Sequence, residues 1–235
     1  MSQLKLDAQI EGVLERLYAQ HTGQNAELIA YFSARMAEGT LDWNSFDQRT
    51  HQFLSDKLVA LERDKAEFCY QLCRALRARR VVEIGTSFGV STLFLAAAVR
   101  DNVRADGGTG LVIGTEYEAA KAQAARANFA EAGLTEFIEL REGDLRETLK
   151  DVGGPVDFVL PVDFVLMDIW TPMARPAMEL LAPHLRVGAA VICDNTIQAR
   201  AGYSDYFEFV HNPANGFRTM TLPFEGGLEF TVRVG

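Results

Sequence analysis

The 235-residue sequence lacks the features of a secreted, membrane-spanning or nucleic-acid-binding protein. It contains no run of five or more basic residues, and no apolar run near the roughly 20 residues that span a bilayer. Residues 1–10 are polar and have no signal-peptide core. The net charge of −9 disfavours a nucleic acid or an anionic membrane as a partner. Three cysteines are too few for a disulfide framework, so we expect a cytoplasmic protein.

What the sequence does contain fits one globular α/β domain with an appended segment. Hydrophobic residues make up 48% of the chain and charged residues 23%, which is enough apolar material for a sizeable core. Cys69 and Cys73 lie four positions apart in a helical pattern. We interpret both as small buried side chains rather than as a redox or metal site.

Residues 1–55 have a helical pattern and no strand, so we expect two helices there. The first apolar stripe is closed by Gly23, and the second precedes Gly39. The stripes consist of Leu6, Ile10, Val13, Leu14 and Leu17, and then Leu28, Ile29, Phe32 and Met36. We interpret 1–55 as a cap, a dimer interface, or both, which predicts a homodimer. A third helical pattern, 54–76, leads directly into the first expected strand. We assign residues 56–235 to a second domain.

From residue 80 onward strands and helices alternate, which favours a parallel sheet with helices on both faces. Strands are expected at 80–84, 110–115, 136–141, 162–168 and 187–193, and helices at 90–100, 117–132, 145–151 and 172–183. Runs at 217–222 and 228–234, joined by five residues, predict a C-terminal antiparallel hairpin. This order predicts the Rossmann-like fold of class I methyltransferases rather than a six-stranded dinucleotide fold.

The segment PVDFVL occurs twice in succession, at 155–160 and 161–166. Both copies together would make a strand about twice the usual length, with a proline inside it. Only the second copy runs directly into Met167 and Asp168. We therefore place that copy in the sheet and the first copy in an extended loop.

The segment 81–93, VVEIGTSFGVSTL, predicts a buried strand, a glycine-framed turn and a helix. Gly85 and Gly89 permit close approach of the backbone to a ligand, and the helix N-terminus offers free N–H groups to an anion. The spacing is GxxxG and not GxGxxG, which argues against a dinucleotide. A small ligand with an anionic group is expected above this strand.

An acidic residue follows each of the five expected parallel strands, where ligands bind in open α/β sheets. Glu116 is positioned to accept from ribose hydroxyls, and Asp144 from an adenine amino group. Ser91, in the first turn of the helix after the glycines, can bind a carboxylate with help from the helix dipole. Adenine, ribose and an amino-acid carboxylate without a pyrophosphate describe S-adenosylmethionine.

Asp168, Asp194 and Asn195 end two neighbouring strands, which lie about 4.8 Å apart in a sheet. Two carboxylates and a carboxamide oxygen are hard ligands that suit Mg²⁺ or Ca²⁺ better than zinc. The alternative is that Asp194 and Asn195 only cap a turn.

With these motifs the chain resembles the cation-dependent O-methyltransferases that include catechol and caffeoyl-CoA O-methyltransferases, in the bacterial branch with an N-terminal helical extension. The likeness covers about 55–235 and rests on VVEIGTSFGVST, GTEYE, EGD, VLMDIW and VICDNT. It implies a metal at Asp168, Asp194 and Asn195, with Asp168 catalytic. It also implies a set of residues at the S-adenosylmethionine site: Glu83, Gly85, Thr86, Ser87, Gly89, Ser91, Glu116, Asp144, Leu145, Asp168 and Trp170.

One position departs from the family pattern. The catechol enzymes have a lysine base three residues after the first metal aspartate, and Thr171 stands there in this chain. Either a metal alone lowers the pKa of the acceptor hydroxyl, or another group takes the proton. His51 and His211 titrate in the right range, although both are more typical of surface or packing histidines.

The resemblance implies methyl transfer to a hydroxyl of a small phenolic or catechol-like acceptor. The aromatic segment 198–216, with Tyr203, Tyr206, Phe207 and Phe209, is expected either to shape the acceptor pocket or to belong to the core. Two other classes remain open: a homologue that binds the cofactor with little or no methyl transfer, and a nicotinamide-dependent dehydrogenase.

Overall fold

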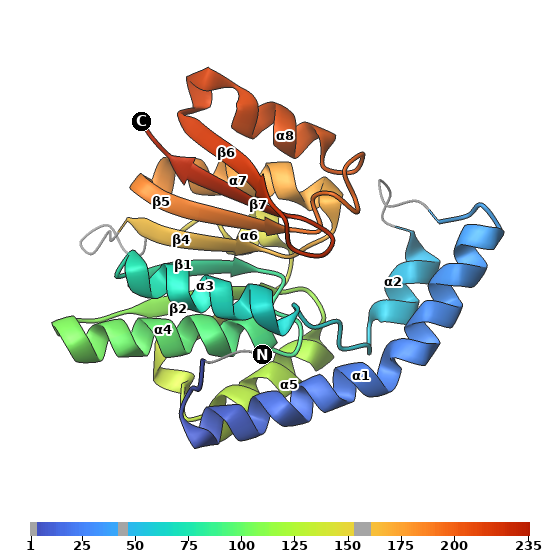
Figure 1. Ribbon diagram of the computed structural model, residues 1–235, viewed down its shortest axis with the longest axis horizontal. Coiled ribbons are helices and arrows are strands. Elements are labelled where there is room, and N and C mark those ends of the chain that lie inside the picture. The colour runs from blue at the N-terminus through green and yellow to red at the C-terminus, as the bar shows by residue number, and fades with distance from the viewer. Residues whose placement is uncertain (1–3, 42–46, 153–160) are drawn as a thin grey trace.

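The computed structural model describes residues 4–41, 47–152 and 161–235, and a seven-stranded sheet forms its centre (Figure 1). The strand order is β3-β2-β1-β4-β5-β7-β6, in which β7 pairs antiparallel with β5 and β6, and the other pairs are parallel. The strands are β1 (Arg80–Ile84), β2 (Leu111–Glu116), β3 (Ile138–Glu142), β4 (Val162–Met167), β5 (Leu185–Asp194), β6 (Phe217–Leu222) and β7 (Leu228–Arg233). The expected Rossmann-like order, five parallel strands closed by a hairpin, is confirmed.

Helices alternate with the strands and cover both faces of the sheet (Figure 1). They are α1 (Ala8–Ala37), α2 (Gln48–Leu54), α3 (Arg63–Ala75), α4 (Val90–Asp106), α5 (Ala119–Glu131), α6 (Leu145–Thr148), α7 (Ala174–Leu181) and α8 (Ser204–His211). Short 3₁₀ turns at Thr135–Phe137, Thr171–Met173, Ala182–His184 and Pro213–Asn215 complete the connections. No helix in the described residues is long and apolar enough to cross a membrane.

Alternating side chains of the strands divide the apolar interior into two layers. Val81 of β1 faces a cluster shared with α1, α3, α4 and α5, whereas its neighbour Val82 faces a cluster shared with α6, α7 and α8. This is the period-two alternation of a sheet buried on both faces. The sheet is therefore fixed from both sides, and its strand ends are held at set positions.

The expectation of two helices separated at Gly23 is wrong, because α1 continues from Ala8 to Ala37 without a break. Gly23 has open space around it, so its effect is only the backbone entropy cost, about 0.5–1 kcal/mol. Burial of Ile10 and Leu14 against α4 and α5 outweighs that cost. The third pattern, 54–76, is also shorter than expected, since α3 begins at Arg63 and a separate α2 precedes it.

The two halves of α1 differ in environment. Ile10, Val13, Leu14 and Leu17 are buried in the main core, whereas Ile29 and Met36 in the second half are 65% and 69% exposed. The first half of α1 therefore packs in the same core as the sheet. The predicted domain boundary at residue 55 stays a prediction.

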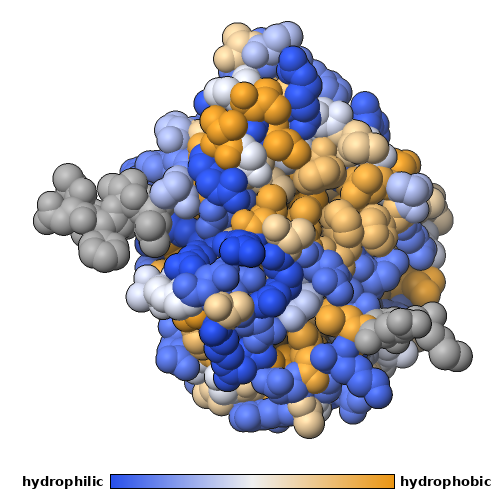
Figure 2. All heavy atoms as spheres, turned by 60° about the vertical axis from the view of Figure 1, so that its left-hand side comes forward, coloured by the Kyte–Doolittle hydropathy of each residue, from blue (hydrophilic) through white to orange (hydrophobic). Residues whose placement is uncertain are grey.

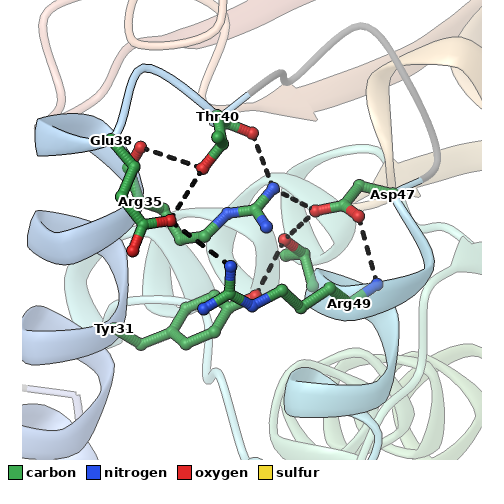
Figure 3. A network of polar contacts seen from close by, with 7 residues as sticks. Tyr31, Arg35, Glu38, Thr40, Asp47 and Arg49 are labelled. Atoms are coloured by element: carbon green, nitrogen blue, oxygen red, sulfur yellow. Dashed lines mark hydrogen bonds and ion pairs between the residues drawn. The ribbon is translucent and has the colours of Figure 1, made fainter.

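The end of α1 is joined to α2 by a polar network (Figure 3). The Arg35 guanidinium donates to the carbonyl of Thr40, at 2.6 Å, and to the carboxylate of Asp47. Asp47 caps α2 by accepting from the backbone N–H of Arg49, at 3.1 Å, and its other oxygen accepts from Thr50 Oγ1 at 2.7 Å. These contacts hold α2 beside the second half of α1, on the side of the molecule toward which the parallel strands point (Figure 1).

The second copy of the duplicated segment forms β4, as expected. Asp163 in that copy accepts from the backbone N–H groups of Arg79 and Arg80, at 2.8 and 3.0 Å, which ties β4 to the start of β1. The first copy, 155–160, lies outside the described residues.

The surface mixes polar and apolar side chains. On the face in Figure 2 hydrophobic side chains gather in the upper part, and hydrophilic side chains lie around them. Large apolar side chains that are well exposed include Ile29, Met36, Tyr117 and Val187.

Candidate active site

The turn from β1 into α4 is built from residues with positive φ angles. Gly85, Ser87 and Gly89 have φ values of 97°, 50° and 89°. A Cβ on Gly85 would lie 1.9 Å from the backbone oxygen of Asp168, so glycine is needed for the turn to pass against the end of β4. A Cβ on Gly89 would lie 2.3 Å from Cε1 of Phe129 in α5, so Gly89 serves the packing of the turn.

Glu83, the fourth residue of β1, is fully buried below this turn. Its Oε2 accepts from the hydroxyls of Thr86, at 2.9 Å, and Thr92, while Oε1 has no hydrogen-bond partner. Burial raises the pKa of Glu83 above its usual range, against the opposing effect of the nearby hydroxyls of Ser91, Thr92 and Thr86. A buried carboxylate oxygen with no partner is a suitable acceptor for the ammonium of an amino-acid ligand.

Glu116 ends β2 beside the same turn. Its Oε2 accepts from the backbone N–H of Ser87 at 2.7 Å, and its Oε1 from the backbone N–H of Glu118 at 2.8 Å. Each carboxylate oxygen has a second lone pair, so both can still accept from hydroxyls of a ribose. The structure thus brings the expected ribose ligand to the turn that carries the glycines.

A pocket lies over the β1–α4 turn, and part of its wall was not expected from the sequence. The turn and the end of β4 contribute Gly85, Thr86, Ser87, Phe88, Val90, Ser91 and Asp168. The opposite wall is the segment 58–61, Leu58, Val59, Ala60 and Leu61, between α2 and α3. The sequence pattern predicted these four residues as part of a helix. The apolar run LVAL was the only sequence feature that could have indicated a buried or pocket-lining role.

Glu83, Gly89 and Glu116 surround the turn without lining this pocket, and three further predicted cofactor residues also do not line it. Asp144 caps α6 and is bound by Arg146, whose Nε lies 3.0 Å from both carboxylate oxygens. Leu145 is buried in the core below. Trp170 precedes the 3₁₀ turn after β4. Their assignment to the cofactor stays a prediction.

The strand ends of β4 and β5 place Asp168 beside Asp194, because Met167 pairs with Cys193 in the parallel register. Asp194 is 2% exposed, and its Oδ2 accepts from Nδ2 of Asn195 at 3.0 Å. Burial and the charge of Asp194 raise the pKa of Asp168 well above its usual range. The three predicted metal residues therefore lie at two adjacent strand ends, and their role as metal ligands stays a prediction.

Lys65, in the first turn of α3, is a member of this cluster that sequence reasoning missed. Its side chain is 1% exposed, and Nζ lies 2.7 Å from Oδ1 of Asp194 and 2.8 Å from Oε2 of Glu62. Burial lowers the pKa of Lys65, but the hydrogen bonds and charges of Asp194 and Glu62 outweigh it and raise the pKa above its usual range. Asp194 thus has a protein cation as its counter-charge.

The carboxylates of Asp168 and Asp194 are hard oxygen ligands that fit a divalent cation in type, whereas Asn195 turns its amide N–H toward Asp194. Within the described residues no group of three or more His, Cys, Asp or Glu side chains is placed to hold a metal. Both oxygens of Asp194 also have protein hydrogen-bond donors, Lys65 and Asn195. A divalent ion would have to share Asp194 with these donors or replace one of them.

The remaining candidates for proton transfer have partners of their own. His51 on α2 pairs with Glu118, with Nε2 2.6 Å from Oε1, and His211 stacks on Phe207 in α8. Thr171 is buried at the start of the 3₁₀ turn. Tyr203, Tyr206 and Phe207 are buried in the core with α7, so these aromatic side chains of 198–216 serve packing.

Comparison with known proteins agrees with this arrangement. The family model described as "Methyltransferase domain" matches residues 82–196, which run from β1 to just beyond β5. A catechol O-methyltransferase of Mycobacterium tuberculosis is 31% identical over 140 residues, which cover 60% of this chain and 58% of that protein. A catechol O-methyltransferase of Niastella koreensis is 26% identical over 143 residues, 60% and 59% of the two chains. The chain thus matches less than two thirds of the length of these curated relatives.

Solved structures share the fold over most of the chain. An O-methyltransferase of Bacillus cereus, in complex with SAH, has a TM-score of 0.68 at 19% identity and covers 98% of this chain and 93% of its own. The O-methyltransferase TomG of Streptomyces achromogenes, in complex with SAM, has a TM-score of 0.68 at 22% identity and covers 89% and 96%. At these identities the likeness concerns the fold.

The sheet order and the glycine turn above β1 define a class I methyltransferase fold. The match over 82–196 identifies that part of the chain as a methyltransferase domain, with catechol O-methyltransferases among its relatives.

Proposed function

We propose that the protein is an S-adenosylmethionine-dependent O-methyltransferase that acts on a hydroxyl of a small phenolic or catechol-like acceptor. The observation that carries this proposal is that the β1–α4 turn, Ser91 and Asp168 line one small pocket. Glu83 with its free Oε1 and Glu116 at the end of β2 lie around the same turn. The names of the curated relatives support a catechol-like acceptor.

In this proposal each polar part of S-adenosylmethionine has a hydrogen-bonding or charged partner in the chain. The N-terminus of α4, with Ser91 in its first turn, would bind the carboxylate, and Glu83 the ammonium. Glu116 would accept from the ribose hydroxyls, and Asp144 from the adenine amino group. The acceptor oxygen attacks the methyl carbon, the carbon–sulfur bond breaks, and its electron pair stays on sulfur, which yields S-adenosylhomocysteine. The fixed positions of donor and acceptor supply much of the rate enhancement.

Asp168, Asp194 and Asn195 would hold a divalent cation, Mg²⁺ or Ca²⁺ by ligand type. When bound, such an ion lowers the pKa of a coordinated hydroxyl and so favours its ionised form. Thr171 cannot act as a base near neutral pH, and His51 and His211 are engaged by Glu118 and Phe207. We therefore assign the ionisation of the hydroxyl to the bound ion and not to a base at position 171.

The test is a set of catechols and hydroxylated aromatics with labelled S-adenosylmethionine, with Mg²⁺ or with EDTA, combined with calorimetry of S-adenosylhomocysteine and NAD. We expect S-adenosylhomocysteine to bind and NAD not to bind, and methyl transfer to a vicinal diol that falls with EDTA. Asp168→Ala should abolish metal-dependent turnover. Full activity of Asp168→Ala in EDTA would contradict the metal mechanism. Cofactor binding without transfer to any phenol would favour the non-catalytic homologue.

We further propose a homodimer formed through the N-terminal helices, supported by Ile29 and Met36, which are exposed on the second half of α1. Light scattering of wild type and Ile29→Glu tests it, since the variant should be monomeric if this face is the interface. A cytoplasmic location also stays a proposal, and the three free thiols Cys69, Cys73 and Cys193 are consistent with a reducing compartment.

A further inference from the structure

A fully buried lysine lies inside the carboxylate cluster at the ends of β4 and β5. The Lys65 side chain is 1% exposed, and charged lysines are rarely buried to this degree unless they are paired. Its partners are Asp194 and Glu62, at 2.7 and 2.8 Å. The helix α3 that carries it packs along α4 in the main core, so the lysine is held in place by its own helix.

The ammonium of Lys65 binds the same carboxylate oxygen of Asp194 that a metal ion would need as a ligand. Lys65 Nζ donates to Oδ1 of Asp194, and Asn195 Nδ2 donates to Oδ2. Asp168 lies on the neighbouring strand end, and the charge of Lys65 acts on it as well. An ammonium and a divalent cation therefore compete for one oxygen, and they repel each other when both are close to it.

We propose that Lys65 is the resident cation of this site, and that it sets the affinity for a divalent metal by competing for Asp194. This inference rests on the metal site of the proposed function. It adds Lys65, which is not one of the proposed metal ligands, as a residue that controls the affinity of that site. Glu62, Asp168 and Asp194 supply three carboxyl groups against the single ammonium of Lys65. A divalent ion is still attracted to the cluster, but it must displace the ammonium from Oδ1.

The experiment measures metal binding directly, without turnover. Mg²⁺ and Mn²⁺ are titrated by calorimetry into the wild-type protein, Lys65→Met and Lys65→Gln, in the absence of any acceptor. Lys57→Met is the matched control, because Lys57 is also little exposed and pairs with two carboxylates, Asp56 and Glu27. We expect both Lys65 variants to bind the metal about tenfold or more tightly than wild type, and Lys57→Met to bind like wild type.

A second measurement needs no folded Lys65 variant. The chain has five lysines, so the ε-¹³C signals of labelled lysine can be followed in the wild type. Mg²⁺ should shift the signal of one buried lysine as Nζ leaves Asp194, and that signal should persist in Lys57→Met. Unchanged or weaker metal affinity in the Lys65 variants, no metal binding in any protein, or no shifted lysine signal would each overturn the proposal.

The outcome is independent of methyl transfer. S-adenosylhomocysteine binding by the same proteins reports on the donor pocket, which Lys65 does not line. If that binding is absent while the metal affinities change as expected, the proposed function fails and the role of Lys65 stands. If S-adenosylhomocysteine binds and the metal affinities do not change, the role of Lys65 fails alone.

Discussion

The backbone N–H of Ser87 donates to Oε2 of Glu116 across 2.7 Å, so the glycine turn after β1 and the end of β2 are joined by a charged hydrogen bond. Glu116 also accepts from the N–H of Glu118, and so it fixes both sides of the expected ribose position. A residue that shapes the turn and is predicted to bind the ribose should be sensitive to replacement.

Glu116→Ala should weaken S-adenosylhomocysteine binding roughly tenfold to hundredfold, since a hydrogen bond to a charged group contributes about 1.5–3 kcal/mol. Calorimetry measures the change. Glu142→Ala is the control, because Glu142 ends β3 in an exposed pair with Arg126. Equal affinities of the two variants for S-adenosylhomocysteine would contradict a role of Glu116 in binding the methyl donor.

Gly85→Ala should destabilise the fold by more than about 3 kcal/mol, because the new Cβ would meet the backbone oxygen of Asp168 at a positive φ. Gly23→Ala is the opposite case: it lies inside α1 with open space around it and should gain about 0.5–1 kcal/mol. Urea unfolding of both variants gives the free energies. A tolerated Gly85→Ala would show that the turn does not pass as closely against β4.

Glu83 predicts a pH dependence of stability. Burial raises its pKa in the folded state, so between the unfolded and folded pKa values the folded protein binds more protons than the unfolded chain. The Glu83 contribution is therefore most favourable below the unfolded pKa, and it is lost as pH rises through the folded pKa. Glu83→Gln should gain stability relative to wild type as pH is raised.

Unfolding of wild type and Glu83→Gln by urea between pH 5 and pH 8 tests this expectation. Glu139→Gln serves as the control, because Glu139 lies exposed on β3 beside Arg141. A difference between wild type and Glu83→Gln that stays constant, or that shrinks as pH rises, would contradict the assignment.

Leu14→Ala should lower the free energy of unfolding by about 2–5 kcal/mol, since Leu14 on α1 is fully buried in the main core. Ile29→Ala, further along the same helix, should change the stability of the monomer by less than about 0.5 kcal/mol. Thermal unfolding at low protein concentration measures both. Similar losses for the two variants would mean that the whole of α1 is packed in solution.

Local sequence patterns were sufficient to predict the sheet, but not to predict which residues surround the site. The strand 80–84 matches β1 residue for residue, because β-branched residues are followed at once by glycines. Gly23 misled the sequence interpretation, since a helix interior tolerates a glycine when tertiary packing exceeds its cost. Lys65 could not be recognised, because its partner Asp194 lies 129 residues away. The segment 58–61 likewise gains its role only through the fold.

A single short stretch, from Leu58 to Lys65, contacts both halves of the site. Its first part walls the pocket over the β1–α4 turn, and its last residue holds Asp194. If a ligand moves this stretch at one end, it changes the free energy of binding at the other end, and thermodynamic linkage makes the effect reciprocal. The order in which methyl donor and cation are added would then not alter the final occupancy, but each would change the apparent dissociation constant of the other by the same factor.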